Sequence, residues 1–119
     1  MNLYRQRIRV LVRRELDAAH AAEALGHFAT AFGHLERAHV LGQSITREHV
    51  LVHWRMFGHA LRQRLTGESF SQAWRIVAAA LFTPVGLVPR GNTGGGNVSG
   101  VRPMEIPADL RQAMADARR

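Results

Sequence analysis

The chain contains no cysteine, no lysine and no long uninterrupted run of apolar residues. The absence of cysteine excludes disulfides, thiolate zinc sites and cysteine nucleophiles. The longest apolar stretches, 76–82 and 85–88, are short and separated by Pro84, so we expect no segment that spans a membrane. Residues 1–16 alternate arginine with apolar residues, unlike the apolar core of a signal peptide. We therefore expect a cytoplasmic protein.

All of the basic side chains are arginine, and the net charge is +7. A basic chain can associate with nucleic acid or with an anionic surface. Arg5, Arg9 and Arg13 recur every four residues and would form a basic stripe along a helix, which suits phosphate contacts. No aromatic residues alternate with them and no recognised DNA-binding turn follows. Nucleic-acid binding is therefore the third of the functions we consider.

Helical periodicity dominates the pattern of apolar residues and predicts an all-α fold. Helices are expected at about 3–25, 27–41, 46–65, 69–82 and 109–118. We expect Gly26 and Gly42 to end the first two helices, Thr46 to cap the third, and Pro84 to follow the fourth. At 119 residues the chain suits one domain, 1–119, with a helical core (1–83), a glycine- and proline-rich loop (84–107) and a terminal helix (108–119).

The first four predicted helices form two antiparallel hairpins whose second helices echo each other. Gly26 is followed by Phe28, Ala31, Leu35 and Ala38, and 42 residues later the same spacings give Phe70, Ala73, Val77 and Ala80. This rhythm of small residues resembles the second helix of a tetratricopeptide repeat, in which small residues let paired helices approach closely. The period differs from the 34 residues of that repeat, so we infer stacked hairpins rather than membership. In the third helix we expect a core face of Val50, Trp54, Phe57 and Leu61.

The clearest chemical pattern lies on either side of the second interhelical turn. Glu36 and His39 are three residues apart before the turn, and His49 and His53 are four apart after it, so each pair lies on one face of its helix. Across an antiparallel hairpin, His39 would lie level with His49, and Glu36 level with His53. Imidazole and carboxylate groups placed in this way suit zinc, iron, copper or nickel.

A single Glu-x-x-His pair is half of the set used by helical di-iron proteins, so we favour a mononuclear site. Its predicted ligands are His39, His49 and His53, with Glu36 as fourth ligand or as a hydrogen-bonding partner of a ligand. The alternative is that these groups are structural, because histidines that border a core commonly bond carbonyl or carboxylate oxygens. We predict surface roles for His20, His27 and His34.

The segment GNTGGGNVS, residues 91–99, lacks the lysine and the Ser/Thr of a P-loop, and no strand precedes it. Its glycines permit tight turns, with Asn92 and Asn97 bonding local backbone. A second possibility is that it folds over the mouth of the hairpin and closes the site.

The segments HLERAHVLGQ, HVLVH, VPRGNTGGGNVS and RPMEIPADL occur in this order, and in this the chain resembles an uncharacterised bacterial family that is known only as a domain of unknown function. The resemblance covers nearly the whole chain and implies no activity. Our leading hypothesis is a small protein for transition-metal handling, storage or sensing. The alternative is a helical-hairpin module that binds a protein partner or forms a homodimer. We favour a non-enzymatic role, although an open metal position could support hydrolysis or redox chemistry.

Overall fold

The computed structural model describes residues 2–119, and within these residues it contains helices and no strand. The elements are α1 (Leu3–Ala24), α2 (Phe28–Gly42), α3 (Thr46–Arg62), α4 (Thr66–Phe82), the short 3-10 helix η1 (Thr83–Val85) and α5 (Ala108–Ala117). The predicted all-α fold class is confirmed.

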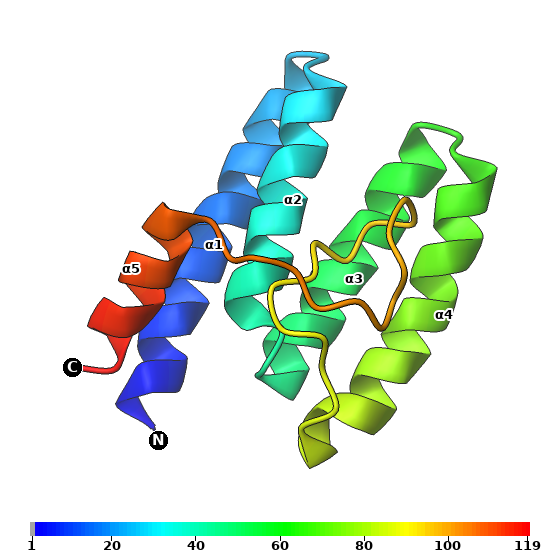
Figure 1. Ribbon diagram of the computed structural model, residues 1–119. Helices are drawn as coiled ribbons and strands as arrows, with labels where there is room; N and C mark the ends of the chain where they lie inside the picture. Colours follow the sequence, from blue (N-terminus) through cyan, green and yellow to red (C-terminus); the bar gives the residue numbers. More distant parts are fainter. Residues whose placement is uncertain (1) are drawn as a thin grey trace.

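Each helix of the first four runs antiparallel to the one before it, and the pairs α1/α2 and α3/α4 form hairpins that join through α2 and α3 (Figure 1). The segment after η1 crosses the face of the molecule and leads to α5, which packs against α1 and α2. No helix among residues 2–119 is long and apolar enough to cross a membrane.

The main buried hydrophobic cluster is formed by α1, α2, α3 and α5 with Ile45 and Ile106 from the connecting segments, and the buried Ala79 of α4 lies outside this cluster. Val12, Leu41 and Met56 are among its fully buried members. The most buried side chain of α4 is instead polar: Gln72 is completely buried. Because α4 packs on α3 outside the core, polar groups lie between these two helices.

The inward face of α3 differs from the prediction. Trp54 and Leu61 are exposed, whereas the buried residues of α3 include His49, Val52 and His53. Both sets have helical spacing, and hydrophobicity alone favoured the first. The polar set lies inside because other polar groups satisfy its hydrogen bonds.

The turns between helices confirm some predicted boundaries and correct others. Gly26 follows α1 with φ +76°, the left-handed conformation expected after a helix end. Gly42 is instead the last residue of α2, and a β-carbon there would lie 2.9 Å from Cβ of Glu48, so close packing requires glycine. Thr46 begins α3 but is not its cap, and α4 begins at Thr66, earlier than predicted.

The echo between the two hairpins does not extend to their environments. In α2, Ala31, Leu35 and Ala38 are buried against neighbouring helices. The corresponding face of α4 is exposed, and Phe70 is 77% accessible. The second hairpin thus presents to solvent the face that the first hairpin buries.

Candidate metal centre

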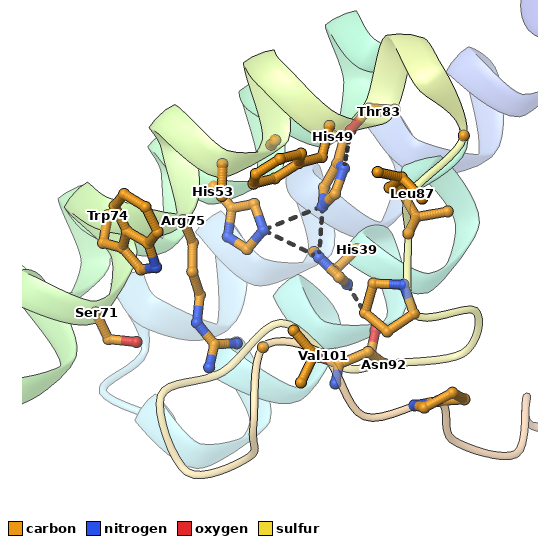
Figure 2. Close-up of a pocket in the computed structure, with 18 residues that line it drawn as sticks. His39, His49, His53, Ser71, Trp74, Arg75, Thr83, Leu87, Asn92 and Val101 are labelled. Carbon is orange, nitrogen blue, oxygen red and sulfur yellow. Dashed lines mark hydrogen bonds between the residues drawn. The ribbon is translucent and has the colours of Figure 1, made fainter.

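Three buried histidines from α2 and α3 converge between these two helices. The Nε2 atom of His39 lies 3.0 Å from Nε2 of His49 and 3.0 Å from Nε2 of His53, and the last two atoms are 3.2 Å apart (Figure 2). Each side chain is less than 10% exposed. The three rings therefore direct the same nitrogen at one point.

Helix geometry places these rings. His39 lies in the last turn of α2, and His49 and His53 lie one turn apart on α3, directly after the short connection between the helices. The alignment of α2 with α3 agrees only partly with the prediction, because His39 contacts both histidines of α3 rather than His49 alone.

The glycine-rich segment fixes the orientation of His39. Its Nδ1 lies 2.6 Å from the backbone carbonyl oxygen of Asn92. A carbonyl oxygen only accepts hydrogen bonds, so Nδ1 of His39 must carry the proton and Nε2 must hold a lone pair. The segment does fold over the end of the α2–α3 hairpin, because the backbone of Gly94 packs directly on the His39 ring.

Gln72 of α4 fixes His53 in the same tautomer. The amide nitrogen of Gln72 donates to Glu68 Oε1 at 2.8 Å and to the carbonyl oxygen of Gly94 at 2.7 Å, which uses both of its hydrogens. Its amide oxygen therefore faces Nδ1 of His53, at 2.6 Å, and accepts a hydrogen bond from the N–H there. Nε2 of His53 is left with its lone pair.

Thr83 provides the partner of the third ring. Its hydroxyl oxygen lies 2.7 Å from Nδ1 of His49 and can accept a hydrogen bond from it. Each histidine thus has a separate oxygen partner on its outer nitrogen, and those partners come from α4, η1 and the glycine-rich segment. Such partners orient the rings of metal-bound histidines and raise their basicity.

Nε2 of His39 and Nε2 of His53 therefore face each other at 3.0 Å with one lone pair each. When Thr83 accepts the hydrogen bond from His49, Nε2 of His49 adds a third lone pair at 3.0–3.2 Å from the other two. Mutually facing lone pairs repel, and a cation among them reverses the sign of the interaction. A tetrahedral zinc ion with bonds of 2.0–2.1 Å holds its ligand nitrogens about 3.3 Å apart. The observed spacing is therefore close to that of a metal-binding set.

The protonation equilibria of these histidines also suit a metal. Burial lowers the pKa of His49 to about 3, and the neighbouring His53 acts in the same direction. Burial lowers the pKa of His53 to about 4. The pKa of His39 also falls well below its usual range, first because the ring is buried and then because of the other two histidines. All three rings are neutral at pH 7, as metal ligation requires.

Glu36, the fourth predicted ligand, does not join the group. The ligand atoms that lie within 4.8 Å of one another belong to His39, His49 and His53. Burial raises the pKa of Glu36; the nearby Thr93 side chain opposes that rise and the Glu68 carboxylate adds to it. The oxygen partners of the three rings were not predicted as such, and none of them is Glu36.

The other histidines lie elsewhere. His20 and His27 are exposed, and His34 bonds Glu15 at 2.7 Å. His59, to which the sequence assigned no role, is buried beside Glu23 at 3.2 Å, a structural pairing away from the three-histidine group. In the basic stripe of α1, Arg9 turns inward and pairs with the buried Glu48 at 3.1 Å, so the stripe is less continuous than predicted.

A cavity of about 550 Å³ adjoins the three histidines. Besides the histidines, its walls come from α4, η1 and the glycine- and proline-rich loop (84–107), and they are mostly apolar, with Trp74, Phe82, Leu87 and Val101 among them. Figure 2 shows the cavity lining. Arg75 is the one charged residue, other than the histidines, among the described residues of the lining. A ligand in this cavity could reach the histidines.

Fold and site together define a small all-α protein with a buried group of three histidines beside a cavity. The family model described as "Protein of unknown function (DUF3703)" matches residues 6–114, and the chain belongs to this family. The predicted membership of a family of unknown function is thereby confirmed. Searches of curated proteins and of solved structures found no match.

Proposed function

We propose that this protein binds one transition-metal ion through Nε2 of His39, His49 and His53. The observation that carries the proposal is the convergence of three Nε2 atoms at 3.0–3.2 Å, two of which, on His39 and His53, hold a lone pair because their outer partners only accept hydrogen bonds. A purely structural cluster would gain more from rings that donate hydrogen bonds to one another. The facing lone pairs of His39 and His53 instead favour a cation between them.

Three imidazoles leave one position of a tetrahedral metal open, as in zinc sites that bind water or substrate. The adjoining cavity supports such a position, because the histidines form part of its wall. One ion per 119-residue chain is a low capacity for storage. We therefore favour metal handling or sensing, in which an exchangeable fourth ligand is useful, and we expect zinc, copper, iron or nickel.

The direct test is the metal content of the untagged protein after incubation with zinc, copper, iron or nickel and removal of free ions, measured by inductively coupled plasma mass spectrometry. We expect about one equivalent in the wild type and loss of metal in His39→Ala and His53→Ala. His20→Ala, which changes an exposed histidine, is the matched control. Failure of the wild type to retain any of the four metals would contradict the proposal.

A second candidate function rests on the exposed face of α4. Phe70, Val77 and Leu81 lie on this face at helical spacing, and each is at least 49% accessible. Contiguous exposed apolar side chains favour a protein-binding role, most simply with a second copy of the chain. Light scattering after size-exclusion chromatography tests this. Phe70→Ser with Val77→Ser should give a monomer without changing metal content, and a wild-type monomer would contradict self-association.

A further inference from the structure

The cavity beside the histidines is larger than a metal site needs. Its volume of about 550 Å³ falls in the range of sites for small organic molecules, about 300–1,000 Å³. An ion with three protein ligands and a water fills only the end of such a space. The remaining volume is large enough for a small organic ligand, and the residues of the cavity wall indicate the chemistry of that ligand.

Charge inside the cavity favours an anion. Arg75 lines it from α4, and in the described residues this partly buried guanidinium forms no ion pair with a carboxylate. Its one hydrogen bond among these residues is from Nη2 to the carbonyl oxygen of Val98, at 2.5 Å, which leaves most of its five N–H groups free. No acidic side chain lines the cavity.

Arg75 lies near His53 and His39. Figure 2 shows its side chain extending from α4 toward the glycine-rich segment, and Arg75 lines the same cavity as His53 and His39. Its positive charge is near enough to lower the pKa of both rings. A divalent metal on neutral imidazoles would add further positive charge at this end. An anionic group in the cavity would be attracted by both positive charges.

The rest of the lining is apolar. Trp74 and Phe82 contribute aromatic surface from α4, and Leu87 and Val101 contribute aliphatic surface from the segment after it. These side chains are 44–82% accessible, so the apolar surface is open to an incoming molecule. A small inorganic anion would leave this surface in contact with water, whereas a molecule with a hydrocarbon part would cover it.

From these observations, and resting on the proposed metal centre, we infer that the site takes a monocarboxylic acid with an apolar body. The carboxylate occupies the open metal position and bonds Arg75, and the hydrocarbon part lies against Trp74 and Phe82. A planar guanidinium matches the two oxygens of a carboxylate.

The test uses the cobalt(II)-loaded protein, whose visible absorption reports on metal ligands. Titration with hexanoate should shift the bands, and hexanoate should bind more tightly than acetate by up to about fourfold for each additional buried CH₂ group. Hexanamide, which lacks the charge, should bind at least about 10-fold more weakly than hexanoate. Inorganic phosphate should bind more weakly than hexanoate, because it leaves the apolar wall uncovered.

Two variants with matched controls assign the contacts. Arg75→Gln should weaken hexanoate binding by about 10-fold or more while cobalt still binds, and Arg47→Gln, an exposed arginine outside the cavity, should have no effect. Trp74→Ala should reduce the preference for hexanoate over acetate. Trp54→Ala is its control, because Trp54 is exposed on α3 and does not line the cavity.

The outcomes separate the two claims. If no cobalt bands form, both the metal centre and this inference are wrong. If the bands form but do not respond to hexanoate, only the inference fails. Equal binding of hexanamide, or tighter binding of phosphate than of hexanoate, would also overturn it.

Discussion

The ring of His39 packs directly on the backbone of Gly94. A β-carbon on this glycine would lie 2.5 Å from Cδ2 of His39, and its φ is +82°. The ring cannot move aside freely, because its two nitrogens are engaged with Asn92 and with the other histidines. A residue 55 positions along the chain thus covers one side of the three-histidine group.

Gly94→Ala should therefore weaken metal binding. Gly26→Ala is a matched control, because Gly26 has φ +76° and nothing within 4 Å of an added β-carbon. Both variants incur the cost of a left-handed alanine, about 1 kcal/mol. Only Gly94→Ala should also lower zinc affinity, by about 10-fold or more, as measured by competition with a chromophoric chelator. Equal zinc affinity in the two variants would show that this contact does not hold the ring.

Gln72→Leu should disturb His53 without touching the metal. It removes the acceptor for Nδ1 of His53 and the donor to the carbonyl oxygen of Gly94. We expect a loss of about 1–3 kcal/mol in the free energy of unfolding for each buried group left unsatisfied. We also expect a 10- to 100-fold loss of metal affinity, about the effect seen for such partners elsewhere. Gln112→Leu on the exposed face of α5 is the control, and unchanged affinity in Gln72→Leu would contradict this role.

Glu36→Gln should leave metal stoichiometry unchanged. Glu36 lies outside the group of ligand atoms, and its pKa is raised by burial, so its ionised form is disfavoured in the folded protein. Removing the charge should not lower the free energy of unfolding at pH 7, which denaturant titration can measure. Loss of the metal in this variant would instead identify Glu36 as the fourth ligand that the sequence suggested.

The metal-free protein should lose stability as the pH falls below about 6.5. Unfolded histidines bind protons there, whereas the folded state keeps His49 neutral to about pH 3 and His53 neutral to about pH 4. Between pH 6.5 and 4 the unfolded state therefore binds more protons. Each such histidine lowers the free energy of unfolding by up to about 1.4 kcal/mol per pH unit.

Denaturant titrations at several pH values in the presence of a chelator measure this slope. His49→Asn should reduce it by about one proton, and His20→Asn should not. A slope that His49→Asn leaves unchanged would mean that this ring already carries a proton in the folded protein.

The sequence predicted the three histidines because helical spacing is local, and two helices joined by a short turn must bring their adjacent ends together. It could not predict Asn92, Gln72 and Thr83 as their partners. Those residues lie 19–53 positions away, and the path of an irregular segment leaves no periodic signal.

The prediction of the buried face of α3 was wrong for a related reason. Trp54 and Leu61 have the spacing and hydrophobicity of a core face, yet they are exposed, while His49 and His53 are buried. A ranking of helix faces by hydrophobicity assumes that a buried polar side chain has no hydrogen-bond partner and therefore costs free energy. Once partners on α4 and η1 remove that cost, periodicity alone cannot distinguish the two faces.

X-ray absorption spectroscopy of the zinc-loaded protein tests most directly whether the three histidines bind the metal. We expect three imidazole nitrogens at about 2.0–2.1 Å from the zinc and one further light atom that the chain does not supply. That fourth signal should change when hexanoate is added. One or two imidazoles, or a carboxylate that disappears in Glu36→Gln, would contradict a centre built from His39, His49 and His53.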